Sequence, residues 1–372
     1  MFQKKSFFLI TIFLFTFFFN YAQTKYNTRN AKQIVKSEKH IKESQENDSS
    51  IIELGNFIEK SIQENNLENY MSKLDKDMFG KLITEKINDD SSLRKYKLGF
   101  REGIKKSFKA IPNKFIDLVE NGGYYDFISY RYDSNDSTYY LLFRLFTLEG
   151  GINYHDYKAS KLDDEFVFND IYIYLSGEPL SKTFERMCIY GIPKNKLFNL
   201  FGKDNSESMQ NLIEATNAHN KGNAELAYKK INAIKGVMAS EKFILILKSQ
   251  MAIGIDDELY KKALLELTEK HPDDTSLYLT QIDYYLLIKE HDKSLELIDR
   301  LKDETEDDFL NYLKGNIEYD RNNYDAAMIH FKYTMDNYAD FFQASANYLC
   351  CLSKQNKMDT ATKNGISPNR FA

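Results

Sequence analysis

The sequence predicts two folded regions: an α+β domain, in which helices pack on a curved four-stranded antiparallel sheet, and an all-helical solenoid after it. Three observations carry this prediction. Apolar residues recur at helical spacing over residues 51–108, the period then becomes alternating over residues 124–175, and four series of residues repeat at steps of 33 or 34 after position 208. A length of 372 residues is enough for two such regions.

The first residues are typical of an export signal. Lys4 and Lys5 precede an apolar run from Phe7 to Phe19, and Ala22 supplies a small residue before a cleavage point. We therefore expect a signal peptide over residues 1–22 and an exported protein, periplasmic or secreted. An uncleaved anchor is the alternative, although the run is shorter than the ~20 residues that span a bilayer, so we expect no stable membrane insertion after cleavage.

The polar residues 23–50 predict a flexible linker. The whole chain has 50 Lys and Arg against 55 Asp and Glu, so no broad basic field is available for nucleic acid, and we expect none as a partner. The cysteines Cys188, Cys350 and Cys351 are odd in number and include two neighbours, which favours small core or surface residues over disulfide, metal or redox roles.

Helices are expected first in the α+β domain. One apolar stripe starts at Ile51 and continues in shorter helical pieces to Ile83. A second helix carries apolar residues from Leu93 to Phe108 and is expected to stop at Pro112, because proline has no backbone N–H to donate.

Four strand-like runs follow Gly122 and Gly123, and short turn sequences between them predict an antiparallel meander. Both faces of the second run are largely apolar, so the sheet must be covered on one side and cupped on the other. The runs cover residues 124–132, 138–148, 152–161 and 166–175.

Helices followed by a long curved sheet resemble the NTF2-like, or cystatin-like, α+β superfamily over residues 51–183. That superfamily includes isomerases and hydratases with a carboxylate or histidine in the cone, and also ligand-binding and structural modules. The resemblance implies three candidate bases, Asp126, Asp156 and Asp170, and one candidate acid or base, His155. It also implies two candidate anion partners, Arg131 and Arg144. Their spacing forms no recognisable motif, and such strand residues commonly form cross-strand pairs, so we expect no catalytic residue.

The C-terminal region repeats. Ala227, Tyr260, Ser294 and Ala327 are separated by 33, 34 and 33 residues. Three more series keep the same steps: Ala215, Lys248, Ile282 and Gly315; Ile231, Leu264, Ile298 and Phe331; Ile234, Leu267, Leu301 and Thr334. A two-helix unit of this length predicts a helical solenoid.

This region resembles a tetratricopeptide repeat (TPR) array, most clearly where Tyr312, Gly315 and Tyr319 precede Ala327 and Phe331. Between the α+β module of residues 51–185 and the array we expect a linker over residues 186–207. The repeats are expected over residues 208–239, 240–273, 274–307 and 308–340, with a partial repeat over 341–358 and a disordered tail over 359–372.

The TPR resemblance implies a partner-binding groove on the first helices of the repeats. Its expected residues are Leu245, Ile253, Leu279, Asp283, Leu286, Leu287, Tyr312, Asn316 and Tyr319. None is Lys or Arg, so the groove suits an extended or helical peptide with aliphatic anchors rather than a peptide carboxylate. Alternatively, these residues pack within the array or against the N-terminal domain.

We expect neither a metal nor a cofactor. The histidines are scattered, and the sequence has no phosphate-binding glycine loop and no nucleophile elbow. The leading hypothesis is therefore an exported, non-catalytic interaction or assembly adaptor that binds a partner peptide or protein through the repeats. The alternative is a small-ligand-binding protein or enzyme that uses the cone, with the repeats as a docking arm. A sealed cone favours the adaptor; a deep cone reached by His155 or a buried carboxylate favours the alternative.

Overall fold

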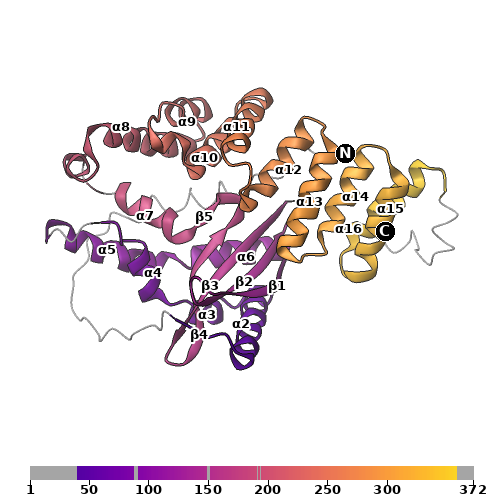
Figure 1. Cartoon of the computed structure of the whole chain (residues 1–372), viewed down its shortest axis with the longest axis horizontal. Coiled ribbons are helices and arrows are strands. Elements are labelled where there is room, and N and C mark those ends of the chain that lie inside the picture. Colours follow the sequence, from indigo (N-terminus) through magenta and orange to yellow (C-terminus); the bar gives the residue numbers. More distant parts are fainter. Residues whose placement is uncertain (1–39, 88–90, 149–150, 191, 193, 358–372) are drawn as a thin grey trace. The chain divides into compact units, whose positions relative to one another are not determined.

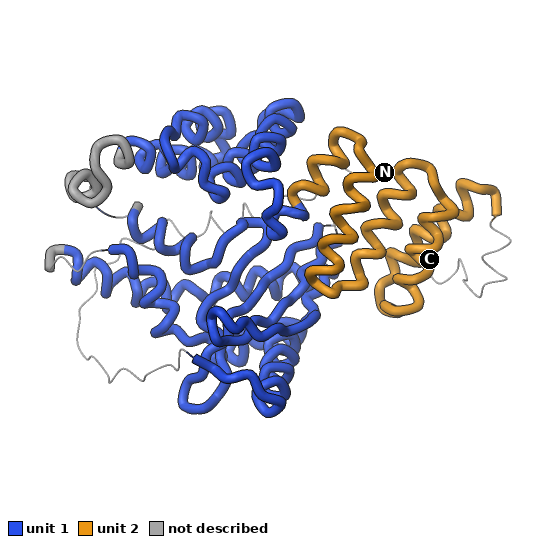
Figure 2. Tube along the Cα trace, viewed as in Figure 1, with its two compact units in different colours: residues 1–279 blue, residues 280–372 orange. Residues whose placement is uncertain are grey.

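The computed structural model describes residues 40–357, apart from 88–90, 149–150, 191 and 193 (Figure 1). The predicted fold class is confirmed: an α+β region with an antiparallel sheet is followed by paired helices. The chain forms two compact units, unit 1 of residues 1–279 and unit 2 of residues 280–372 (Figure 2). The expected export signal and C-terminal tail lie outside the described residues. In the described ranges, no helix combines the length and apolar character needed to cross a membrane.

The strands lie where the alternating pattern predicts them and pair antiparallel in chain order. Their bounds are β1 Tyr124–Asp133, β2 Thr138–Phe146, β3 Ile152–Leu162 and β4 Glu165–Ile173. A further strand, β5 Glu178–Pro179, pairs with the end of β4. Two residues are too few to show an alternating pattern, which is why the sequence does not predict β5.

The helices before the sheet are α2 Gln45–Gln63, α3 Leu67–Ser72, α4 Lys76–Leu82, α5 Ser91–Ser107 and α6 Ala110–Glu120. The fold starts earlier than expected, because Ile41 is 3% exposed and its N–H donates to the Ser137 carbonyl. Residues 40–50 therefore belong to the domain and not to the predicted linker. Helix α6 was not expected, because Pro112 suggests a stop. Pro112 instead occupies the first turn of α6, where its missing N–H would have no helical partner.

The core of the α+β region lies between the sheet and helices α2 and α6 (Figure 1). Helix α2 comes close to the sheet at Gly55, where a Cβ atom would lie 2.6 Å from the Phe127 ring. The buried side chains here are mostly aromatic on the sheet and aliphatic on the helices: Tyr125, Phe143, Tyr157 and Phe168; Ile51, Leu54, Ile58 and Ile116. The helix-covered face of the sheet is thus filled by side chains.

Paired helices follow the α+β region. Their bounds are α8 Lys194–Asn220 and α9 Ala224–Ile231, α10 Lys242–Ile253 and α11 Asp257–Lys270, α12 Tyr278–Leu287 and α13 His291–Thr305, α14 Leu310–Asp320 and α15 Tyr324–Asn337, then α16 Phe342–Lys354. Small residues let the helices of a pair approach: Ala227, Ser294 and Ala327 are fully buried. At Gly315 a Cβ atom would lie 2.6 Å from the Phe331 ring.

The predicted linker is mostly helical, since α7 Leu180–Tyr190 and α8 cover most of residues 186–207. The first helical pairs also pack on the α+β region. The Arg186 guanidinium lies 3.4 Å from the Phe243 ring centroid, and Lys242 Nζ donates to Tyr172 Oη at 2.9 Å. These contacts explain why the division between compact units falls after Leu279 and not at the predicted linker.

Candidate functional site

The sheet separates the candidate polar residues by face. Residues paired directly across strands share a face, and the pairs Asp126 with Arg144, Arg131 with Tyr140, and Lys158 with Asp170 lie on the face opposite the helices. His155 pairs with Phe143, whose side chain is in the helix-covered core. His155 therefore cannot act together with the candidate carboxylates.

His155 takes part in a buried chain of hydrogen bonds in the core. The Tyr70 and Tyr157 hydroxyls are 2.8 Å apart, those of Tyr157 and Tyr125 are 2.7 Å apart, and Tyr125 Oη is 3.1 Å from His155 Nδ1. All four residues are at most 1% exposed. The chain satisfies polar atoms that would otherwise be costly to bury.

The tautomer of His155 follows from its neighbours. Asn153 Oδ1 accepts the Leu175 N–H, so Asn153 Nδ2 is the atom that donates to His155 Nε2, at 3.0 Å. The imidazole proton must then sit on Nδ1 and be donated to Tyr125. Burial lowers the pKa of His155 to about 3, so the ring stays neutral and is a structural residue of the core.

Both candidate arginines are already paired with carboxylates. Arg131 holds Asp156 with two bonds, Nη1 to Oδ1 at 3.0 Å and Nη2 to Oδ2 at 2.6 Å. Arg144 Nη2 lies 2.5 Å from Asp126 Oδ2. Such pairing satisfies the charges locally, so neither arginine is placed as an open anion site.

A cavity of about 570 Å³ opens on the face opposite the helix-covered core, between β2, β3 and β4, helix α4 and the start of α7. Its polar wall includes Thr138, Tyr140, Asp156, Lys158, Ser160, Asn169, Asp170, Tyr172, Ser181 and Lys182. Its apolar wall includes Met78, Leu82, Ala159 and Pro179. This volume lies within the ~300–1,000 Å³ usual for small-molecule sites.

A β-bulge directs two consecutive polar residues into the cavity. Lys158 pairs with Asp170 but Ala159 pairs with Phe168, so Asn169 is an extra residue in β4. The backbone of Phe168 is held on its other edge, where its N–H donates to Lys73 and its carbonyl accepts from Asp75, both at 2.8 Å. Bulges of this kind re-aim side chains beside functional sites.

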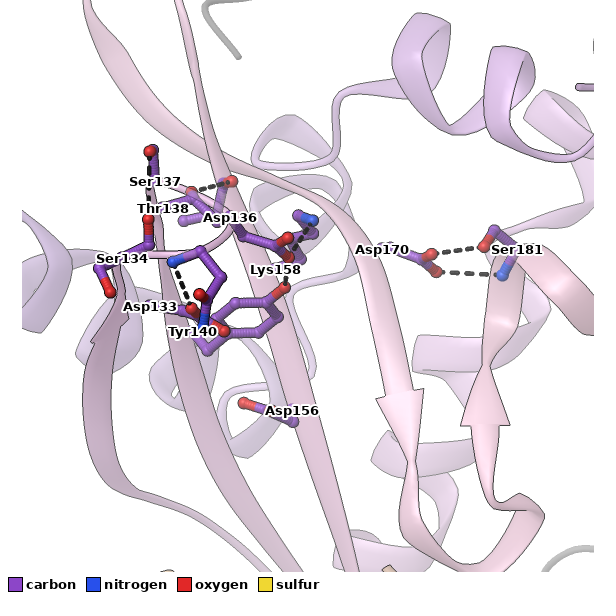
Figure 3. Close-up of polar contacts among 12 residues, drawn as sticks. Asp133, Ser134, Asp136, Ser137, Thr138, Tyr140, Asp156, Lys158, Asp170 and Ser181 are labelled. Carbon is purple, nitrogen blue, oxygen red and sulfur yellow. Dashed lines mark hydrogen bonds and ion pairs between the residues drawn. The ribbon is translucent and has the colours of Figure 1, made fainter. Parts of the chain in front are cut away.

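Asp170 is a buried carboxylate held by three donors. Its Oδ1 accepts the N–H group of Ile171 at 2.9 Å. Figure 3 shows its two bonds with Ser181: Oδ1 accepts the Ser181 N–H at 3.0 Å, and Oδ2 accepts the Ser181 hydroxyl at 2.5 Å. Burial nevertheless raises the pKa of Asp170 to about 6, above the ordinary aspartate value. The three bonds lower the pKa but do not fully offset desolvation.

Two neighbours of Asp170 have unsatisfied atoms. Ser160 Oγ and Asn169 Oδ1 make no hydrogen bond to any described residue, although Ser160 is 3% and Asn169 7% exposed. Sequence reasoning did not select either residue. A signal does exist for Asn169, because Asn169 and Asp170 interrupt the apolar run from Phe166 to Ile173 with two consecutive polar residues. Nothing comparable marks Ser160, which reads as an ordinary strand serine.

Of the predicted groove residues in unit 1, Leu245 is 1% and Leu279 3% exposed, whereas Ile253 is half-buried. Leu245 packs with Leu267 and Leu277 in a core cluster. Leu245 and Leu279 therefore pack inside the protein and do not line an open groove.

Of the predicted groove residues in unit 2, Tyr312 and Asn316 are buried. The Tyr312 ring centroid lies 4.7 Å from that of Phe341, and Asn316 Oδ1 accepts from Asn347 Nδ2 at 2.9 Å, so both join neighbouring helices. The remaining predicted residues are half-buried: Asp283, Leu286, Leu287 and Tyr319.

Comparison of the chain with protein-family models, curated proteins and solved structures found no match. Among the described residues, no group of three or more His, Cys, Asp or Glu side chains is placed to hold a metal ion. Function must therefore be inferred from the residues themselves.

Proposed function

We propose that the protein is a non-catalytic binding protein whose α+β region holds a small polar ligand in the sheet cavity. The observation that carries this proposal is the cavity of about 570 Å³ on the open face of the sheet, whose wall combines the buried carboxylate of Asp170 with the apolar side chains of Met78, Leu82 and Pro179. Small-ligand sites typically combine a volume of this order with an apolar surface and a few placed polar groups.

This proposal favours a small ligand over a protein partner, but at a different location from the cone that the sequence predicts. The cone between helices and sheet is filled by aromatic side chains around His155, whereas the cavity lies on the opposite face. Binding is favoured over catalysis because general acid–base chemistry needs a group free to exchange a proton with substrate. Asp170 already accepts three hydrogen bonds, and Asp156 is held by Arg131.

Protein docking through the helical repeats is the second candidate function, and it corresponds to the exported adaptor. It is favoured by apolar side chains that α12 leaves partly exposed: Leu286 and Leu287 are half-buried, and the following Ile288 is 38% exposed. Such a strip could seat the aliphatic anchors of a peptide. The TPR family and the export of the chain are part of this proposal, which rests on the repeat spacing and on residues 1–22.

The ligand-binding proposal is tested with methionine methyl NMR on the full chain. Met78 lines the cavity, and Met251, which is 1% exposed among the helical pairs, is an internal control. In a screen of polar compounds below about 300 Da, which suit a cavity of this class, binders should shift the Met78 Cε resonance and leave that of Met251 in place. If no compound moves Met78, the cavity is not a binding site.

A further inference from the structure

Helix α16 carries an apolar stripe on the side that faces away from the preceding helices. Its inner side is marked by buried residues: Ala344, Tyr348, Cys351 and Leu352. A second set recurs at spacings of four, three and four residues, which places it on one stripe of the opposite side: Phe342, Ala346, Leu349 and Ser353. Phe342 is 61% exposed, Ala346 and Ser353 are exposed, and Leu349 is half-buried. Helical arrays usually end in a polar outer face, so the described residues leave this stripe without a cover.

The preceding repeat shows what such a stripe contacts. Ala346 corresponds to Tyr312 of α14 at the repeat step of 34 residues, and the Tyr312 ring centroid lies 5.9 Å from that of Phe331 in α15. Leu349 likewise corresponds to Gly315, where a Cβ atom would lie 2.6 Å from the Phe331 ring. The outer stripe of α16 is therefore the side on which a first helix of this array packs against another helix.

The sequence after α16 lacks the large side chain that this contact uses. The turn after α16 repeats the turn after α14 at the same step, since Asn322 and Asn356 both have a positive φ, of 63° and 56°. Phe331 then corresponds to Gly365, which lies outside the described residues and has no side chain to fill the space. The helix that covers α16 must bring large side chains from elsewhere.

A second copy of α16 supplies them if the two helices pack antiparallel. In a two-fold contact, residue i of one copy meets residue j of the other, and j meets i. With the axis midway between Ala346 and Leu349, the small Ala346 meets the large Leu349 of the second copy. The large Phe342 then meets the small Ser353 of that copy. Each layer thus combines one large and one small side chain, which suits the close packing of two helices.

The charges at the two ends of α16 favour the same orientation. Asp340 is exposed just before the first residue of the helix, and Lys354 and Lys357 are exposed at and after its last residue. In an antiparallel pair, each acidic end lies beside the basic end of the other copy. A parallel pair would bring like charges together, which is unfavourable.

We propose that the protein forms a two-fold dimer in which the outer stripes of two α16 helices pack antiparallel. This inference goes beyond the proposed function and does not depend on it, because the contact lies in unit 2 and uses no residue of the cavity wall. One helix from each copy makes a small interface, so the dimer is reversible.

The test is sedimentation equilibrium of the full chain over a concentration series. We expect the weight-average mass to rise from that of one chain towards that of two, with a Kd below about 100 µM. Ala346→Glu should keep the helical signal and Tm, because Ala346 is exposed, but should weaken the dimer at least about tenfold by placing a charge against Leu349 of the second copy. Ile329→Glu is the matched control: Ile329 is 70% exposed on α15, outside the stripe, so this variant should leave the Kd unchanged.

Charge reversal tests the orientation of the helices. Lys354→Glu should weaken the dimer about threefold, because it places like charges at neighbouring helix ends. Adding Asp340→Lys to this variant should restore the affinity, since the two ends are again opposite in sign. If the double variant binds no better than Lys354→Glu alone, the antiparallel arrangement is wrong.

A chain truncated after Lys357 distinguishes a second copy from the chain's own last residues. If α16 is the dimer contact, the truncated chain should keep the Kd of the full chain within about twofold. A monomeric full chain beside a dimeric truncated chain would mean that residues 358–372 cover the stripe, and the proposal would be overturned. It would also be overturned if the full chain stayed monomeric at every concentration, or if Ala346→Glu and Ile329→Glu changed the Kd equally.

Discussion

Replacing Asp170 by Asn should change how the stability of unit 1 depends on pH. The substitution keeps the side-chain shape, and an amide oxygen can still accept the N–H groups of Ile171 and Ser181. It removes a carboxylate that burial makes hard to ionise: the pKa of Asp170 is raised from 3.8 to about 6. The variant therefore isolates the cost of the buried charge.

The magnitude follows from the pKa shift. A shift from 3.8 to about 6, at 1.36 kcal/mol per unit, corresponds to about 3 kcal/mol of lost stability when Asp170 is ionised in the native state. Between these two pKa values the native state binds more protons than the unfolded state, so this cost is fully present above pH 6 and disappears as the pH falls towards 3.8. Asn does not titrate, so the stability of the variant lacks this dependence on pH.

The assay is the melting temperature of wild type and Asp170→Asn, followed by circular dichroism between pH 4 and pH 7.5. We expect the Tm of the variant relative to wild type to be about 5 °C higher at pH 7.5 than at pH 4, using ~2 °C per kcal/mol for a large unit. His155, with its pKa lowered to about 3, destabilises both proteins on acidification and cancels in the difference. Glu85→Gln, at an exposed position of the same cavity wall, is the control and should show a flat difference. A flat difference for Asp170→Asn would refute the assignment of Asp170 as a desolvated carboxylate.

Further predictions concern the core and the repeats. Tyr157→Phe removes the central hydroxyl of the buried chain and should lower the free energy of unfolding by about 2 kcal/mol in urea denaturation; a loss below about 0.5 kcal/mol would mean that the chain contributes little. Gly315→Ala should cost about 1–3 kcal/mol because a Cβ there meets the Phe331 ring, whereas the control Gly99→Ala, with open space around it, should be neutral or stabilising; equal effects would contradict the close packing of α14 on α15. Leu286→Asp should keep the helical signal and Tm while weakening capture of a partner about tenfold; if it unfolds unit 2, Leu286 is a core residue and the docking proposal loses its best side chain.

Periodicity explains the elements that could be predicted. The first four strands of the meander are nine or more residues long and are separated by turn sequences, and the repeats recur at steps of 33 or 34, so β1 to β4 and the helical pairs lie close to the predicted ranges. Short or interrupted patterns carry less information. Pro112 suggested a stop because the sequence does not show whether a proline lies in the first turn of a helix, and β5 is too short to have a period.

The candidate site depended on contacts that sequence does not contain. Asp156 and Asp170 were among the predicted carboxylates and do line the cavity. His155 directly precedes Asp156 in β3, and neighbouring residues of a strand point to opposite faces, so His155 lies on the other face of the sheet. That the Ser160 hydroxyl has no partner among the described residues is a property of three-dimensional packing. Likewise, the position of the unit boundary after Leu279 depends on contacts such as that of Arg186 with Phe243.

A crystal structure of the full chain soaked with the tightest-binding compound of the polar screen tests the central claim most directly. We predict density for the ligand in the sheet cavity, beside the Asp170 carboxylate and against Met78 and Leu82. Ligand bound elsewhere on the protein would contradict the claim that this cavity is the binding site.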